Sequence, residues 1–564
     1  MSTEQTIKDA IDTLLRARPG FWSRTACGVT RSMGQIPALI DRNAYSVETS
    51  RIRILLVGGL SGHNADVDMA LHALELFAGG GDALSLRIAL SAVPCANPDG
   101  LRLNVAPSNG AGGNPSGVYP PEGKFYYDPE DPEKRYLWRW ICFQAPDLVL
   151  ELHSGGSLQW EVNQAGQALA PGLAAKTVTG DQGLLAALGT GHPDGLGTIP
   201  GIRLTANDEQ LPRELSRLFS MLRQLDLLAT SDARQSLDIR RNRSKVEIAN
   251  VLAMAYGRTF EPIVYTQGVP ISGRMRLHQL EPTGENPAPD IARLLEGFTS
   301  EGVPEDLAPS ALASVVWADE LTDATGDPRY NDLVIQAADR FESRGQGSAP
   351  KPCDPGFRTE DMFMSGAILG RAFKLTGDAQ YTDILADFMV SGKIQQSHGL
   401  FWHCRSAAYY WGRGNGFAAM GLAETLTYLP DDHPQRPEII TMYGQLMESL
   451  RRLQHPSGML NNVLDIQGSY LEFTATCMMG YAMARGIRLG FLSKDFQDAV
   501  DLAWQGIAER VDDVGNVVDG CASTGVQNNV REYLDRPAIF GFDDRSGGMA
   551  LWFAVEAERL GRGI

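Results

Sequence analysis

Cysteine is scarce in this sequence. The 564 residues hold seven cysteines, an odd number, and no two of them form a CxxC pair. A disulfide framework or a cysteine zinc site needs paired or closely spaced cysteines, so the sequence disfavours both. Scattered single cysteines are typical of reduced thiols, and we therefore expect a cytoplasmic protein.

Long apolar runs and a surplus of basic residues are also missing. No uninterrupted apolar stretch approaches the length of a membrane span, and residues 1–20 lack the apolar core of a signal peptide. The formal net charge of −18 argues against nucleic acid or an anionic membrane as the main partner. An acidic ligand would therefore need a locally basic pocket. Coiled-coil heptads are absent as well, so the oligomeric state stays open.

What the chain has is an ordinary globular composition, 43% hydrophobic and 21% charged, over a length sufficient for two or three domains. Between residues 50 and 230, short apolar runs alternate with helical stretches. This alternation predicts a mostly parallel α/β sheet. The expected strands are 51–60, 85–96 and 145–155, with a helix over 67–80 and a long Gly-, Pro- and Asn-rich loop over 103–132.

From residue 290 onward, strand-like runs nearly vanish, and helical segments follow one another through Gly, Pro and Asp turns. Paired helices of this kind predict an α-solenoid or a closed α/α barrel. A loose repeat, TGD followed by Tyr and a helix, occurs at 325–330 and 376–381. We interpret it as a structural turn between helices, in which Gly follows the end of one helix. The predicted domains are 1–232 (α/β), a connecting segment 233–290, and 291–564 (all-α).

Six short motifs stand in order along the helical half. They are EDLAPS (305–310), TGDPRY (325–330), TEDMFMSG (359–366), HGLFWH (398–403), WGRGNGF (411–417) and SYLEFTATCMMGYAMARG (469–486). Together they resemble glycoside hydrolase family 105, the unsaturated rhamnogalacturonyl and related uronyl hydrolases, over roughly residues 300–564. The resemblance implies an (α/α)6 barrel, in agreement with the helix pairs.

The implied substrate is an acidic unsaturated oligosaccharide, left by a polysaccharide lyase, with a C4=C5 double bond in its terminal uronic acid. By resemblance, an acid protonates C4, water adds at C5, and the hemiketal opens and expels the aglycone without a cofactor. Asp361 lies where the family carries its proton donor, and Asp306 where it carries a second carboxylate. Burial and a nearby carboxylate would raise the pKa of such a donor. The competing interpretation makes both residues helix N-caps.

Further residues match the segments with which the family contacts its substrate. They are Trp402, His403, Trp411, Arg413 and Asn415. Alternation places Trp411, Arg413 and Asn415 on one side of an extended, Gly-loosened loop. A Trp face can stack on a sugar ring, and an Arg can pair with a carboxylate through its planar fork. The alternatives are core positions and a Gly-rich connection with a structural Arg.

Three motifs of the N-terminal half, GGLSGHNAD (58–66), CANPDG (95–100) and DLVLELHSG (147–155), resemble those of the zinc metallocarboxypeptidase superfamily (family M14) and its succinylglutamate desuccinylase-like relatives. The resemblance implies a zinc site of His63, Asp66 and His153, with Glu209 as general base. Asp66 stands where the superfamily has Glu, and no Arg follows Asn114 in the expected carboxylate clamp, so we do not expect carboxypeptidase activity.

Three functions therefore compete. The first is an unsaturated uronyl hydrolase that acts through Asp361, with an appended zinc-hydrolase-like domain. The second is a zinc-dependent amidase or esterase that acts through the N-terminal domain, while the barrel binds carbohydrate. The third is a non-catalytic sugar-binding protein. The motifs favour the first, and they leave the polysaccharide and the aglycone open.

Overall fold

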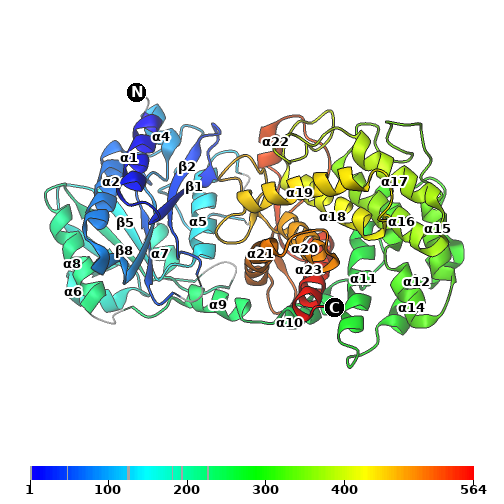
Figure 1. Ribbon diagram of the computed structural model, residues 1–564. Coiled ribbons are helices and arrows are strands. Elements are labelled where there is room, and N and C mark those ends of the chain that lie inside the picture. Colours follow the sequence, from blue (N-terminus) through cyan, green and yellow to red (C-terminus); the bar gives the residue numbers. More distant parts are fainter. Residues whose placement is uncertain (1–2, 47–48, 124–127, 181, 192–194, 225–227) are drawn as a thin grey trace. The chain divides into compact units, whose positions relative to one another are not determined.

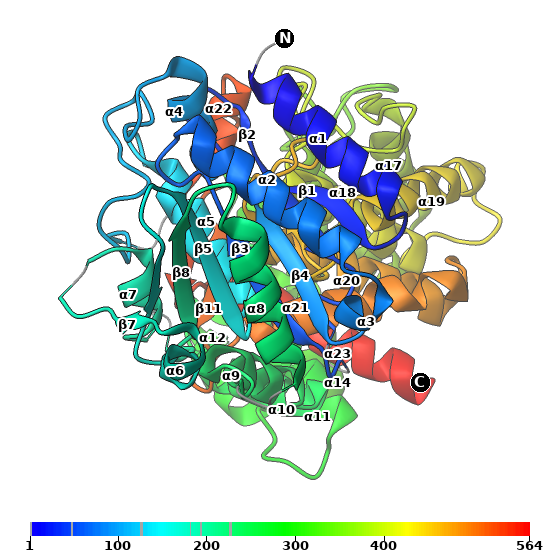
Figure 2. The same ribbon diagram turned by 90° about the vertical axis from the view of Figure 1, so that its left-hand side faces the viewer.

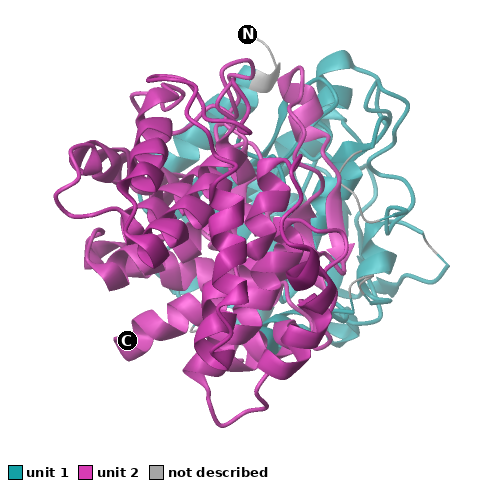
Figure 3. Cartoon of the chain, turned by 90° about the vertical axis from the view of Figure 1, so that its right-hand side faces the viewer, with its two compact units in different colours: residues 1–240, 467–470 teal, residues 241–466, 471–564 magenta. Residues whose placement is uncertain are grey.

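The computed structural model describes the chain except for residues 1–2, 47–48, 124–127, 181, 192–194 and 225–227. The chain divides into two compact units (Figures 1 and 3). The first holds residues 1–240 and 467–470, and the second holds residues 241–466 and 471–564. Within the described ranges, no helix combines the length and the apolarity that a bilayer span requires.

The predicted connecting segment 233–290 is wrong, because these residues are largely helical. They form most of α9 (Asp232–Arg241), all of α10 (Lys245–Ala255) and α11 (Tyr265–Leu280), and the start of a further helix. The many Arg and Ser residues suggested a linker. Ser244 instead begins α10 with a capping box, since its side chain accepts the N–H of Glu247 while the Glu247 carboxylate accepts the N–H of Ser244.

In the first unit, the described strands form one mixed sheet in the order β1-β2-β4-β3-β5-β8-β6-β7. Its centre is parallel, as predicted, because β3 pairs with β4 and β5, and β5 pairs with β8. The outer strands β1, β2 and β6 run antiparallel to neighbours. The strand bounds are β1 Trp22–Val29, β2 Gln35–Asp41, β3 Ile52–Val57, β4 Ile88–Val93, β5 Leu148–Ser154, β6 Gln159–Val162, β7 Lys176–Thr177 and β8 Gly201–Ala206.

Three helices pack on this sheet through one apolar cluster. They are α1 (Thr3–Ala17), α2 (Asn64–Gly79) and α8 (Leu211–Gln224), which lie in front of the strands in Figure 2. Ile11, Leu74 and Leu218 are buried in this cluster together with strand residues such as Leu56 and Leu150. The carboxyl ends of β3, β5 and β8 therefore reach one sheet edge, where ligands commonly bind in α/β folds.

In the second unit, described without a gap, helices alternate along the chain between an inner and an outer ring. Each inner helix packs on the next, and the last packs on the first, so the ring closes into an α/α barrel. The inner members are α11, the broken helix α13–α14 (309–325), α16 (Thr359–Thr376), α18 (Gly412–Tyr428), α20 (Phe473–Leu489) and α23 (Asp544–Arg562). The outer members are α10, α12 (Ala288–Glu301), α15 (Arg329–Ala338), α17 (Ala379–Ser391), α19 (Arg436–Leu453) and α21 (Gln497–Glu509).

The predicted TGD turns between these helices are confirmed. Gly326 follows α14 and Gly377 follows α16, each in the left-handed conformation, with φ of 75° and 73°. A residue without Cβ adopts this conformation without strain, which explains glycine after the helix end. The side chain of Asp378 then accepts the N–H of Gln380 at the start of α17. The repeat is therefore architectural.

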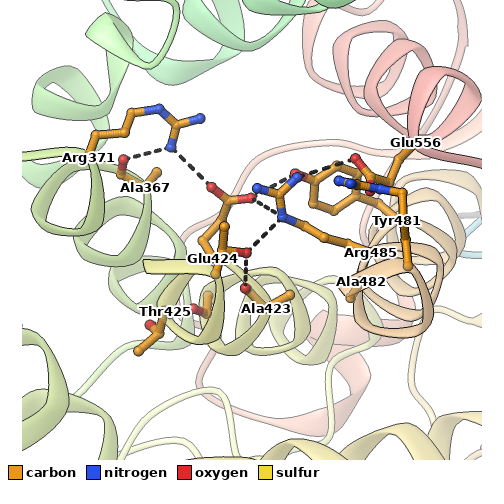
Figure 4. Close-up of polar contacts among 12 residues, drawn as sticks. Ala367, Arg371, Ala423, Glu424, Thr425, Tyr481, Ala482, Arg485 and Glu556 are labelled. Carbon is orange, nitrogen blue, oxygen red and sulfur yellow. Dashed lines mark hydrogen bonds and ion pairs between the residues drawn. The ribbon is translucent and has the colours of Figure 1, made fainter. Parts of the chain in front are cut away.

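The inner helices run in the same direction. Near their N-termini, the hydroxyl oxygens of Thr474 on α20 and Ser546 on α23 lie 2.9 Å apart, and Gln267 of α11 donates to Asp544 of α23. The C-terminal halves of four inner helices likewise contact one another, through buried charged side chains (Figure 4). The barrel therefore has one end lined by helix N-termini and one end lined by helix C-termini.

The buried charges of Figure 4 tie the C-terminal halves of four inner helices together. Glu424 of α18 accepts from Arg371 Nη1 of α16 at 3.0 Å and from the Tyr481 hydroxyl of α20 at 2.7 Å. Arg485 lies 3.4 Å from Glu424 and 3.3 Å from Glu556 of α23. Burial alone raises the pKa of Glu424, but the charges of Arg485 and Arg371 outweigh it and lower the pKa to about 2. Glu424 is therefore ionised.

Two glycines let α16 and α18 approach each other closely. A Cβ on Gly366 would lie 2.9 Å from the carbonyl oxygen of Gly421, and a Cβ on Gly421 would lie 2.5 Å from the carbonyl carbon of Met362. Both obstacles are backbone atoms within packed helices. They cannot move aside without separating the helices, so these positions require glycine.

We expect Gly421→Ala to destabilise the helical unit by about 1–3 kcal/mol, because the added methyl group forces α16 and α18 apart. Thermal unfolding followed by circular dichroism measures the change. Gly444→Ala on the outer helix α19 is the matched control. No atom lies within 4 Å of a Cβ at position 444, so alanine there raises stability by up to about 1 kcal/mol through helix propensity. Equal unfolding temperatures for the two variants would contradict this packing.

Candidate functional site

Asp361 lies in the first turn of α16 with 8% of its surface exposed. It does not cap the helix, because Arg358 holds the N-cap position. Its Oδ2 accepts the N–H of Asp354 at 2.8 Å. Burial raises the pKa of Asp361 to about 7, the Asp354 amide opposes this rise, and the charge of Glu360 adds to it. Asp361 is therefore a carboxylic acid that holds its proton close to neutral pH.

Glu360, the residue before Asp361, is the ionised partner of this acid. His403 Nε2 lies 3.0 and 3.1 Å from its two oxygens, and Arg358 Nη2 donates to Oε1 at 2.8 Å. Burial alone raises the pKa of Glu360, but the charge and hydrogen bond of His403 and the charge of Arg358 lower it to about 2. Two adjacent carboxyl groups with separated pKa values are a common arrangement for acid–base chemistry.

His403 is fully buried and continues this chain of contacts. Its Nδ1 lies 2.5 Å from the hydroxyl of Tyr533, on α22 (Val530–Leu534), and burial raises the pKa of Tyr533 to about 12. The His403 ring also packs on Trp411, with centroids 4.8 Å apart. Both ring nitrogens are engaged inside the protein, so contact between His403 and a substrate stays a prediction.

The predicted extended loop at residues 411–415 is wrong. Trp411 is the N-cap residue of α18, and Arg413 and Asn415 lie in the first turn of this helix. The glycines that suggested a loop instead permit close packing, since a Cβ on Gly412 would lie 2.5 Å from the carbonyl oxygen of Asn461. Trp411 therefore lies at the N-terminal end of a helix and not in a loop.

A cluster of cationic and aromatic groups surrounds Trp411. The guanidinium carbons of Arg413 and Arg536 lie 4.9 and 4.5 Å from its ring centroid. Arg413 is fully buried and donates through Nη1 to the carbonyl oxygen of Cys521. Its Nε and Nη2 are buried without a hydrogen-bond partner among the described residues. A buried guanidinium with free donors is suited to an anionic group.

Asn415 and Trp402 are held mainly by the barrel itself. The Asn415 amide accepts the N–H of Phe401 at 2.8 Å and donates to the carbonyl oxygens of Phe401 and Trp411 at 3.0 and 3.1 Å. Trp402 is half-buried and packs on the barrel core. Their predicted contacts with a substrate stay predictions, and Asn415 positions the segment that carries His403.

Asp306 does not cap a helix, contrary to the competing interpretation. It is exposed in a turn between α12 and α13, and Ala308 is the N-cap residue of α13. It makes no hydrogen bond or ion pair with any residue that the structure describes. Its role as second carboxylate stays a prediction, whereas Glu360 is the buried carboxylate that neighbours Asp361.

In the first unit, Asp66 and His153 come together at the carboxyl edge of the sheet. Asp66 accepts the N–H and hydroxyl of Ser154, both at 2.7 Å, and the hydroxyl of Ser61 at 2.5 Å. His153 Nδ1 lies 3.9 Å from Asp66, and Nε2 lies 2.6 Å from Glu151. Burial lowers the pKa of His153, but Glu151 outweighs it, and the net pKa is raised.

The other predicted members of the zinc site lie on the surface. His63, at the N-cap of α2, and Glu209, in the turn after β8, are both exposed. Among the described residues, no three His, Cys, Asp or Glu side chains are grouped to hold a metal ion. An imidazole must lose its proton to bind a metal, whereas Glu151 favours protonated His153. As they lie, these residues do not fit zinc.

We therefore expect the purified protein to carry far less than stoichiometric zinc, because Ser61, Ser154 and Glu151 engage Asp66 and His153, while His63 lies exposed. Inductively coupled plasma mass spectrometry of the wild type and of His153→Ala measures this. Stoichiometric zinc in the wild type that is lost in His153→Ala would overturn the expectation and would restore the predicted zinc site.

Sequence reasoning missed Glu360, Tyr533 and Arg536. Glu360 stands inside a motif that we had singled out, and its only signal was its position beside Asp361. Tyr533 is 130 residues from His403 in the chain, and no spacing pattern brings them together. Only the closure of the barrel does so.

Comparisons with known proteins agree on the helical unit. A family model described as Glycosyl Hydrolase Family 88 matches residues 362–561. Unsaturated rhamnogalacturonyl hydrolase YesR of Bacillus subtilis (strain 168) is 30% identical over 149 residues, which are 26% of this chain and 41% of that protein. Protein Atu3128 of Agrobacterium fabrum is 30% identical over 170 residues, which are 27% of this chain and 71% of that protein.

One solved structure is similar to part of this chain. A possible member of family GH105 from Klebsiella pneumoniae is 19% identical, with a TM-score of 0.49, over 58% of this chain and 94% of that chain. This chain covers 41% of the length of each of the first two curated relatives. The resemblance of the first unit to zinc metallocarboxypeptidases stays a prediction.

Proposed function

Because this chain belongs, through its helical unit, to glycosyl hydrolase family 88, we propose that it releases a 4,5-unsaturated uronic acid from the non-reducing end of lyase-generated oligosaccharides. Asp361 carries this proposal. Hydration of the enol ether needs an acid that still holds a proton near neutral pH, and Asp361 is a buried carboxyl group with a pKa of about 7. The names of the relatives, which refer to unsaturated rhamnogalacturonyl and rhamnoglycuronyl substrates, support the same chemistry.

In the proposed reaction, Asp361 gives its proton to C4 of the unsaturated ring. The oxygen of a water molecule then bonds to C5, and the proton that the water releases restores the acid. The hemiketal opens as its C5–O5 bond breaks, which leaves a ketone at C5 and a hemiacetal at C1. The bond from C1 to the aglycone oxygen then breaks, the C1 hydroxyl gives up its proton as C1 becomes an aldehyde, and the aglycone takes up a proton and leaves as an alcohol.

Arg413 is the proposed binding residue for the carboxylate of the uronic acid. Its unpaired Nε and Nη2 form the planar fork that suits a carboxylate. Trp411 is fully buried against Arg413 and Arg536, so it supports these guanidinium groups, and its stacking on a sugar stays a prediction. Arg413 and Arg536 provide the local positive charge that a chain of net charge −18 needs for an acidic ligand.

The test is to incubate the protein with oligosaccharides from several lyase digests and to follow the ultraviolet absorbance of the conjugated double bond. We expect this absorbance to fall at the same rate with and without a chelator, because no step uses a metal. Absorbance that stays constant across digests of glycosaminoglycan, rhamnogalacturonan and ulvan type would remove the proposed function. Loss that stops on adding the chelator would favour chemistry in the first unit.

A further inference from the structure

We propose that Glu360 is a positioning residue for the proton donor, fixed by His403, Tyr533 and Arg358 so that a permanent negative charge stands beside Asp361. This inference deepens the proposed function and rests on it. Glu360 is the buried carboxylate next to the acid in the chain, and it does not belong to the residues that the motifs assign to catalysis.

Two side chains hold Glu360 directly, and a third, Tyr533, holds one of these two in place. His403 approaches both carboxylate oxygens, and Arg358 approaches one of them. Tyr533 holds the opposite nitrogen of His403 at 2.5 Å, and its hydroxyl accepts the N–H of Gln527 at 3.2 Å. The carboxylate therefore cannot turn toward a substrate, and its effect on the reaction passes through Asp361.

The negative charge of Glu360 opposes the ionisation of Asp361, which other neighbouring groups favour. The groups that face Asp361 are Cys353, Asp354 and Arg358 from the preceding segment and Glu360 on the same helix. Arg358 and the Asp354 amide favour the ionised form of Asp361, and so does the positive end of α16. Burial and Glu360 oppose them. Removing the Glu360 charge therefore lets Asp361 lose its proton at lower pH.

The experiment compares the pH dependence of kcat/KM for the wild type, Glu360→Gln and Arg358→Gln. Because Asp361 acts in its protonated form, activity falls as pH rises through its pKa. Glu360→Gln keeps the shape of the side chain and removes its negative charge. The fall of kcat/KM at alkaline pH therefore moves to lower pH by roughly one unit. Arg358→Gln removes an opposing charge and moves the same limb to higher pH. Activity of Glu360→Gln should recover toward the wild-type value at acidic pH.

Opposite shifts distinguish positioning from a merely structural role. If both variants lose activity equally at every pH, or if neither limb moves, the inference is wrong. Arg358 is partly exposed, so its variant keeps the test available if Glu360→Gln does not fold.

A second readout separates this inference from the proposed function. Infrared titration of the protonated carboxyl band, identified by its absence in Asp361→Asn, follows Asp361 without any substrate. If no lyase digest is consumed but the band shifts in opposite directions in the two variants, the proposed function fails while the positioning of Asp361 stands. A band that titrates at the same pH in wild type and both variants overturns the inference.

Discussion

Asp361→Asn is expected to abolish consumption of unsaturated oligosaccharides, lowering kcat/KM by about 10³-fold or more. The amide keeps the shape of the side chain and can still accept the N–H of Asp354, but it has no proton to give to C4. The ultraviolet absorbance of the double bond measures the loss. Asp378→Asn is the matched control, because the same change is made at an exposed helix cap, and it should leave kcat/KM unchanged.

The same variant is expected to be more stable than the wild type at about pH 8. The pKa of Asp361 in the fold, about 7, lies above its ordinary value of 3.8. Ionising this buried acid therefore costs stability, fully above pH 7 and not at all below 3.8. The gain from Asn amounts to at most about 4 kcal/mol.

Thermal unfolding at several pH values tests this expectation. The difference between Asp361→Asn and wild type should shrink as pH falls from about 8 to about 4. A variant that loses both activity and stability at every pH would indicate that Asp361 supports the fold, and the assignment as proton donor would then lose its basis.

Glu424→Gln has the second large expected effect, a loss of about 3–5 kcal/mol of stability in the helical unit. The substitution leaves Arg371 and Arg485 buried beside a neutral amide that cannot balance them. Differential scanning calorimetry measures the shift of the unfolding transition. Glu448→Gln is the matched control, since Glu448 and Arg451 form a pair with each side chain 37% exposed. Such pairs contribute about 0–1 kcal/mol.

The pH dependence of this effect has a definite sign. The pKa of Glu424 is lowered from 4.5 to about 2, so its contribution is present above pH 4.5 and is lost as pH falls toward 2. The helical unit of the wild type should therefore lose stability in that window, and Glu424→Gln should lose less. Equal acid sensitivity of both proteins would show that the charge network does not hold the helices together.

The sequence predicted the fold well where a short segment determines its own secondary structure. The parallel centre of the sheet followed from continuous apolar runs, and the turns at Gly326 and Gly377 followed from glycine chemistry. The prediction failed at 233–290 and at 411–415, where composition suggested loops. At 411–415 tertiary packing decides, because the glycines near Trp411 permit close contacts with neighbouring segments. At 233–290 the capping box of Ser244 and Glu247 is a local helix signal that the composition hid.

The site was predictable in part for the same reason. Asp361 could be singled out because its motif is contiguous, and its burial follows from its place in the first turn of α16. Glu360 contacts Arg358 and His403, and His403 in turn contacts Tyr533, so three separate segments of the chain meet here. No spacing in the sequence encodes that convergence. Asp306 lies exposed although a matching motif assigns it to the site, and its role as second carboxylate stays a prediction.

The common direction of the inner helices has a consequence for electrostatics. Each helix N-terminus carries the equivalent of about half a positive elementary charge, and in this barrel those ends gather around the rim where α16 and α18 begin. Acidic side chains stand at several of these ends, including Glu360, Glu472 and Asp544, and they balance the dipoles. The positive helix end draws the proton from a nearby acid, so Asp361 keeps its proton only because burial and the neighbouring Glu360 offset the dipole of α16.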